Sequence, residues 1–290
     1  MGAEKKFLPL FSKWFAPKGF EMSVRFLDLE HNTSGSDWFC GDLHGTFDEL
    51  MRSLDEAGFD GSKDRLFCVG DLHDRGPDSL KCLGLLGKPW FYTVDCNHNE
   101  VLLDYVAGRL TDQEMVERGA TWFLEKPKRE QLRVLQVLEG VPTAIRIGRG
   151  SAARINLFHA EYLGGDQRLD SAGPVVSQGL SVECKSSLLW GRVLADEIRD
   201  GVETERECAE SLSPSFVGHT VVASPFEYQN HIFMDCGIWS HSPKSVRRGH
   251  GPMNFPLYCL QADQWHFCAP NESTVRYTSS LSDRVRTLCR

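Results

Sequence analysis

The most constraining feature of the sequence is a regular alternation of short apolar runs and helical stretches. Each run has the length of a buried strand, and apolar residues then recur at helical spacing. The runs are Trp38–Cys40, Leu66–Val69 and Trp90–Val94, and the helical stretches are Thr46–Ala57, Asp78–Leu86 and one from about Glu100. This βαβαβ order predicts an α/β fold with a parallel sheet.

After the third strand-like run, the pattern changes from alternating strands and helices to a helical segment followed by a strand-rich half. Residues Thr111–Glu139 are charged and helical in pattern. Strand-like runs then follow at Thr143–Ile147, Arg154–Phe158, Phe216–Val217, His231–Asp235 and Leu257–Gln261, with a first strand expected at Ser23–Leu27. Gly164–Ser187 and Ser240–Pro252 are rich in turn formers, and we expect loops at the rim of a site. We therefore expect one domain over residues 23–290, with a strand-rich C-terminal half, behind a loosely ordered extension of residues 1–22.

Composition excludes some classes of partner. The net charge of -8 argues against general binding to nucleic acid or to a membrane surface, because both need a basic footprint. No apolar stretch is long enough to cross a bilayer. The chain has 10 cysteines, and several lie inside apolar runs without any C-x-x-C pair. This usage predicts free thiols in a reducing, cytoplasmic compartment.

Polar clusters follow the three strand-like runs directly, at Gly41–Gly45, Gly70–Gly76 and Cys96–Glu100. Ligand sites in open α/β sheets form beyond the carboxyl ends of the strands, so we expect the clusters to meet at one rim. Asp42 and His44 are two residues apart and point the same way in extended backbone. A carboxylate with an imidazole suits Mn, Fe or Zn.

Further oxygen and nitrogen donors extend this half-site. Asp71 has two oxygens and could bridge two ions, while Asn97 offers a neutral oxygen. His159 and His219 each end a strand-like run and are donors for a second ion. Each residue alone is weak evidence, and their joint occurrence favours a two-metal site.

The three clusters resemble the G-D-x-H-G, G-D-x-x-D-R-G and G-N-H-E motifs of the metal-dependent phosphoprotein phosphatases, in the calcineurin-like metallophosphoesterase family. The chain is most similar to the compact bacterial and bacteriophage serine/threonine phosphatases of the lambda type. The resemblance runs from about Phe39 to Asp235 and includes Leu189–Arg192. It implies a β-sandwich flanked by helices.

By this resemblance, two divalent ions bind the protein, with Mn²⁺ expected and Fe or Zn as alternatives. The implied ligands of the first ion are Asp42, His44 and Asp71, and those of the second are Asp71, Asn97, His159 and His219.

The resemblance also implies a reaction, in which a metal-bridging hydroxide attacks phosphorus directly. His98 is the implied general acid, and Asp74 fixes its tautomer and orientation. Arg75, Asn97 and Arg192 are the implied phosphate-binding residues. The expected substrate is a phosphoprotein or phosphopeptide carrying phosphoserine, phosphothreonine or phosphotyrosine.

Four positions depart from the family pattern. Cys96 replaces Gly, Asn99 replaces Glu, Asp95 stands where Arg is usual, and His73 stands where Val or Ile is usual. An aspartate in place of an arginine repels a phosphate dianion. We therefore hypothesise that His73 and Asp95 form a compensating ion pair across neighbouring strand ends.

Two other functions stay open from the sequence. One is hydrolysis of dinucleoside polyphosphates or cyclic nucleotides on the same fold. Asp74 argues against the first of these, because symmetric tetraphosphate hydrolases usually lack an Asp before Arg-Gly. The other is an impaired protein that binds metal or phosphate without turnover, and the changes at Asp95, Cys96 and Asn99 are its only support.

Overall fold

The computed structural model describes residues 26–166, 169, 182–202, 204, 211–240, 255–268 and 275–278. The predicted extension, residues 1–22, lies outside this part, so the domain boundary stays a prediction. Most of the predicted loop Gly164–Ser187 and nearly all of Ser240–Pro252 also lie outside it.

Two six-stranded sheets form the centre of the described structure. One, here called the motif sheet, has the order β12 (Val275–Thr278), β11 (Gln264–Cys268), β10 (Phe255–Cys259), β2 (Asp37–Cys40), β3 (Arg65–Cys68) and β4 (Phe91–Thr93). The other, the distal sheet, has the order β1 (Phe26–Leu29), β5 (Ala144–Ile147), β6 (Ile155–Leu157), β7 (Ser215–Val217), β9 (His231–Phe233) and β8 (Phe226–Tyr228).

Each sheet contains three neighbouring parallel strands. In the motif sheet these are β2, β3 and β4, which confirms the predicted βαβαβ unit. In the distal sheet they are β6, β7 and β9. Parallel strands end at the same edge of a sheet, so each sheet presents three consecutive loops at one rim.

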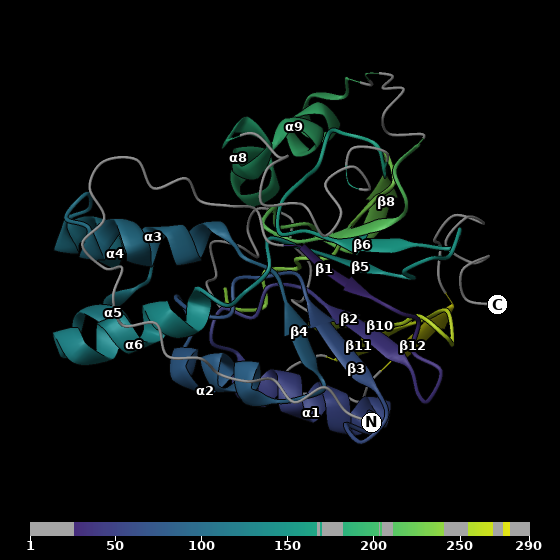
Figure 1. Cartoon of the computed structure of the whole chain (residues 1–290), viewed down its shortest axis with the longest axis horizontal. Helices are drawn as coiled ribbons and strands as arrows, with labels where there is room; N and C mark the ends of the chain where they lie inside the picture. Colours follow the sequence, from purple (N-terminus) through teal and green to yellow (C-terminus); the bar gives the residue numbers. More distant parts are fainter. Residues whose placement is uncertain are drawn as a thin grey trace.

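Helices cover the outer faces of both sheets (Figure 1). Those on the motif-sheet side are α1 (Phe47–Ala57), α2 (Ser79–Gly84) with the 3₁₀ turn η1 (Leu85–Gly87), α3 (Asn97–Val106), α4 (Asp112–Glu117), α5 (Thr121–Leu124) and α6 (Lys128–Leu138). Two helices, α8 (Val182–Trp190) and α9 (Val193–Asp200), lie against the distal sheet. The expectation of a loop up to Ser187 is wrong for residues 182–187, which belong to α8.

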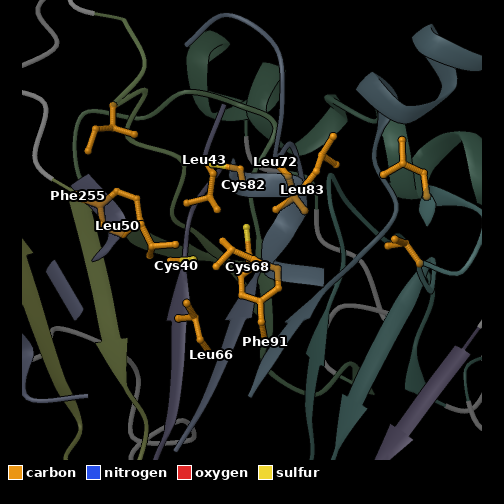
Figure 2. Close-up of a cluster of buried hydrophobic side chains, with 14 of the residues drawn as sticks. Cys40, Leu43, Leu50, Leu66, Cys68, Leu72, Cys82, Leu83, Phe91 and Phe255 are labelled. Atoms are coloured by element: carbon orange, nitrogen blue, oxygen red, sulfur yellow. The ribbon is translucent and has the colours of Figure 1, made fainter. Parts of the chain in front are cut away.

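Apolar layers hold these elements together. Figure 2 shows Leu50 of α1 and Cys82 of α2 packed toward Cys40 and Cys68 of the motif sheet. A second cluster lies between the sheets and joins residues from both halves of the chain, including Phe39, Phe67, Ile145, Leu157 and Phe216. This cluster therefore packs the two halves of the chain against each other.

Seven cysteines in the described part are free thiols, and six of them are buried. Within the described residues, none of the helices is both long enough and apolar enough to cross a membrane.

Candidate metal centre

The two rims face each other, and their loops bring the candidate ligands together. Asp42, Asp71 and Asn97 follow β2, β3 and β4 of the motif sheet, and His159 and His219 follow β6 and β7 of the distal sheet. The backbone N–H of His219 donates to Asp42 Oδ2 at 3.1 Å, which ties the two rims directly. All five of these side chains are buried.

Asp71 lies at the centre of the cluster. Its Oδ2 is 3.2 Å from His44 Nε2, and its Oδ1 is 3.6 Å from His159 Nε2. Two groups of side chains could each hold a cation, namely His44, Asp71 and His98, and Asp42, Asp71 and His159. Asp71 belongs to both groups, which is the geometry of a bridging carboxylate.

The imidazole orientations fit metal binding. His44 Nδ1 donates to the His73 carbonyl, and His159 Nδ1 donates to the Val69 carbonyl, each at 2.9 Å. A histidine that ligates a metal typically donates its other ring N–H in this way. Each Nε2 lone pair therefore points into the site. His44 Nε2 faces Asp71 Oδ2, and His159 Nε2 lies 2.8 Å from Asn97 Oδ1 and 3.6 Å from Asp71 Oδ1. Two acceptors facing each other repel unless a positive charge lies between or beside them.

Several buried atoms in the site have no hydrogen-bond partner. They are Asp71 Oδ1, His219 Nε2 and Asp235 Oδ2. Burying such groups without a partner is costly, and divalent cations bound in the cluster would offset that cost. Mixed carboxylate oxygen and imidazole nitrogen donors suit Mn, Fe or Zn. The donor set present therefore fits a pair of divalent ions.

Asp235 is a site residue that the sequence reasoning missed as a ligand candidate. It follows β9, as Asp42 follows β2, and its carboxylate is buried beside Asp42 and Asp71. The signal was available, because an aspartate at the end of a strand-like run is what singled out Asp42 and Asp71.

The charges of these groups depend on burial and on each other. Burial raises the pKa of Asp42, with repulsion from Asp235 and Asp71 adding to the effect. Burial likewise raises the pKa of Asp235 to about 6. Burial lowers the pKa of His44 to about 4, so its imidazole is neutral and able to ligate at pH 7. The site is thus a cluster of crowded carboxylates and neutral imidazoles that a cation would stabilise.

The backbone of the site is strained. His44 and Asp71 both have φ 42°, and Asp74, Arg75 and His219 also have positive φ. Non-glycine residues adopt this region at a cost, and such residues gather at functional sites. Gly218 allows the two rims to approach, because a Cβ there would overlap Asp42 Oδ1.

His98 is held beside the cluster by a carboxylate. Its Nδ1 donates to Asp74 Oδ2 at 2.6 Å, so Nε2 points into the site, 3.8 Å from Asp71 Oδ2. Trp122 Nε1 donates to the other oxygen, Asp74 Oδ1, at 2.6 Å. The two predicted residues are therefore in hydrogen-bond contact, and this contact directs His98 Nε2 toward the cluster.

Two arginines add positive charge. Arg75 donates to His44 Nε2 at 2.5 Å and to His98 Nε2 at 3.0 Å, and its guanidinium carbon lies 4.2 Å from the Trp239 ring centroid. Arg192 lies at the other side of the cluster and donates to the His219 carbonyl at 3.3 Å. An ion on His44 Nε2 would require Arg75 to turn away, which would leave its planar fork available for an anion.

The hypothesis of a direct ion pair between His73 and Asp95 is wrong. His73 Nε2 contacts Asn99 Oδ1 at 2.9 Å, and Asn99 Nδ2 donates to Asp95 Oδ1 at 2.9 Å. Asn99 therefore stands between the two residues. Asp95 Oδ2 pairs instead with Lys185 of α8 at 3.8 Å.

The two-sheet sandwich and the strand-end cluster of carboxylates and imidazoles are typical of hydrolases that cleave phosphate esters with two metal ions. A family model, Calcineurin-like phosphoesterase, matches residues 38–192, more than half of the chain. The chain belongs to this family of metallophosphoesterases.

Similar proteins include a protein phosphatase and tetraphosphatases. The chain is 29% identical to Serine/threonine-protein phosphatase 2 of Escherichia coli (strain K12), over 78% of this chain and 96% of the relative. It is also 29% identical to an asymmetrical bis(5'-nucleosyl)-tetraphosphatase, PrpE, of Halalkalibacterium halodurans, over 68% of this chain and 83% of the relative. A crystal structure of a putative diadenosine tetraphosphatase has a TM-score of 0.54 at 19% identity, covering 89% of this chain and 100% of that one, and shows the shared fold.

Proposed function

We propose that this metallophosphoesterase is a two-metal phosphomonoesterase that dephosphorylates phosphoserine, phosphothreonine or phosphotyrosine in proteins. The observation that carries the proposal is the hydrogen bond between His98 and Asp74, with His98 Nε2 directed at the cluster around Asp71. A protein-bound alkoxide is a poor leaving group, so its departure gains most from an oriented acid. The similarity to a serine/threonine-protein phosphatase supports the same substrate class.

The candidate ligands are Asp42, His44, Asp71, Asn97, His159 and His219, and Asp235 adds a further carboxylate. Two divalent ions, expected to be Mn²⁺, would lower the pKa of a shared water and neutralise charge on the phosphoryl oxygens.

The side chains then have distinct roles. Arg75 binds and orients the phosphoryl group through its two Nη atoms, and Arg192, at the start of α9, supports the same group from the other side of the cluster. His98 gives the proton on Nε2 to the leaving oxygen. Asp74 holds Nδ1–H, which fixes the tautomer and stabilises the imidazolium before the transfer.

A second candidate function is hydrolysis of a dinucleoside polyphosphate. It is favoured by the tetraphosphatase relative and by Asp95, which replaces an expected phosphate-binding arginine and is paired with Lys185 and Asn99. Loss of that arginine would alter how the site holds a single phosphoryl group.

The test compares purified wild-type protein with His98→Asn, each with Mn²⁺ and with a chelator. Three substrates are used: p-nitrophenyl phosphate, a phosphoserine peptide and diadenosine tetraphosphate. We expect Mn²⁺-dependent release of phosphate from the first two. In the variant, turnover of the phosphoserine peptide should fall about 10²–10⁴-fold, the usual contribution of a general acid, and turnover of p-nitrophenyl phosphate should fall less, because p-nitrophenol is a more acidic leaving group. Turnover of only the tetraphosphate would establish the second function. If metal binds but none of the substrates turns over, the protein is a binding protein and both proposals are wrong.

A further inference from the structure

His73 is the least expected residue of the second motif, and its surroundings indicate what it does. Its side chain is fully buried at 0% exposure. Nδ1 contacts Asp74 Oδ1 at 2.9 Å, and Nε2 contacts Asn99 Oδ1 at 2.9 Å. A valine or isoleucine at this position could make neither contact.

Hydrogen-bond polarity fixes the direction of both contacts. Asp95 can only accept from Asn99, so the Asn99 amide nitrogen faces Asp95 and its oxygen faces His73. His73 Nε2–H must then donate to that oxygen. Asp74 Oδ1 is also an acceptor, so His73 Nδ1–H donates to it. His73 therefore uses both ring N–H groups as donors, one on each side.

This arrangement acts on the carboxylate of Asp74. Rotation about the terminal torsion of an aspartate is soft, so one contact at Oδ2 leaves the plane of the carboxylate poorly fixed. His73 and Trp122 both donate to Oδ1, while His98 donates to Oδ2. Trp122 already supplies one donor to Oδ1, and His73 adds a second, which restricts the carboxylate plane further. The carboxylate plane in turn sets the direction of His98.

The series of hydrogen bonds from Asp74 through His73 to Asn99 and Asp95 is also anchored at its Asp95 end. Asn99 is 5% exposed and lies on α3, and Asp95 Oδ2 meets Lys185 of α8 at 3.8 Å. Lys185 also pairs with Glu100 at 3.3 Å. The departures at His73, Asp95 and Asn99 are therefore one connected structure rather than three separate losses.

We propose that His73 is a positioning residue that holds Asp74, and through it His98, by a buried hydrogen-bonded chain anchored on Asn99 and Asp95. The inference rests on the proposed function, because it assigns His73 to the general acid of that reaction. It also explains how the chain accommodates Asp95 in place of an arginine. The Asp95 carboxylate is engaged by Asn99 and Lys185 and serves as a support.

The experiment compares two esters that differ in their need for an acid. Phenyl phosphate releases a phenol with a pKa of about 10, like that of tyrosine, whereas p-nitrophenol is more acidic and leaves with less help. The variants are His73→Val, which restores the usual residue type, and Asn99→Leu, which keeps the His73–Asp74 contact but removes its support. His98→Asn is the reference for complete loss of the acid.

For His73→Val we expect kcat on phenyl phosphate to fall about tenfold, the size of one hydrogen bond to a charged group, and to fall less than twofold on p-nitrophenyl phosphate. KM should stay unchanged on both esters. In Asn99→Leu, kcat should again fall more on phenyl phosphate than on p-nitrophenyl phosphate, but by a smaller factor than in His73→Val. The double variant should have the same kcat on phenyl phosphate as His73→Val alone, because both substitutions act through the same series of hydrogen bonds.

An equal loss on both esters would overturn the proposal and make His73 a purely structural residue. If kcat of His98→Asn falls equally on both esters, His98 is not the general acid and the proposed function is wrong. If only His73→Val shows an equal fall, the proposed function stands and the role of His73 is wrong. His266→Gln, at a buried histidine of β11, is the control for loss of a buried imidazole. Far-UV circular dichroism monitors folding. If His73→Val does not fold, His73→Gln and Asn99→Leu decide the question by the same comparison.

Discussion

The close approach of the two rims at Gly218 gives a steric test of the metal centre. Gly218 has an ordinary backbone φ, so alanine is acceptable to the backbone itself. A Cβ at this position, however, would lie 2.5 Å from Val69 Cγ2, about 0.9 Å short of ordinary contact at 3.4 Å, and would overlap Asp42 Oδ1 more deeply. Gly218→Ala must therefore displace the Asp42 carboxylate or the end of β7 by about an ångström.

The expected effect follows from that displacement. Misplacement of a reacting group by about 1 Å can cost about 10²-fold in rate. We expect kcat on p-nitrophenyl phosphate to fall by about that factor in Gly218→Ala, and Mn²⁺ binding measured by titration calorimetry to weaken. Gly84→Ala is the matched control, because a Cβ there meets nothing within 4 Å and Gly84 lies in α2. Wild-type Mn²⁺ affinity and turnover in Gly218→Ala would refute the assignment of Asp42 as a ligand.

Two further substitutions test the charges of the site. Arg75→Lys should lower kcat/KM on p-nitrophenyl phosphate about tenfold or more, mainly through KM, because an ammonium cannot replace the planar two-point contact; an unchanged KM would show that Arg75 does not bind substrate. In metal-free protein, the ionised form of Asp235 is disfavoured by burial, and its pKa of about 6 lies above the usual 3.8. Its contribution to stability is therefore present at low pH and is lost as pH rises from about 4 to about 6. Asp235→Asn should gain stability relative to wild type across that window in urea unfolding with a chelator present, and a constant difference would contradict the assigned pKa.

The sequence predicted most of the motif sheet and its rim, for a physical reason. Gly-Asp directly after an apolar run marks a strand that ends at a polar site, and Asp42 and Asp71 both carry this signal. Asn97 and His98 lack this Gly-Asp signal, and they are singled out by their place after the third strand-like run and by the resemblance to the G-N-H-E motif. Local pattern is sufficient here because each strand, loop and helix is contiguous in the chain.

Other features depend on distant packing and could not be read locally. Helix α8 buries Leu188 against the distal sheet, but turn-forming residues precede it in the sequence. Strand β8 has 3 residues, too few for a period of two to be recognised. The hydrogen-bonded link from His73 to Asp95 could not be predicted from the sequence either, because it depends on the Asn99 side chain lying between the two residues.

The division of the site between two sheets has a consequence for folding. Asp42 and Asp235 lie 193 positions apart in the sequence yet are buried side by side. His219 and Asp235 also lie beyond residue 192, where the match to the family model ends. A fragment limited to the matched region would keep the motif-sheet loops and His159 but would lack two of the groups that close the cluster. Such long-range contacts carry a large loop-closure cost and form late. Capture of ions at this site would therefore be a late event that follows docking of the two sheets, and bound ions would hold the sheets together.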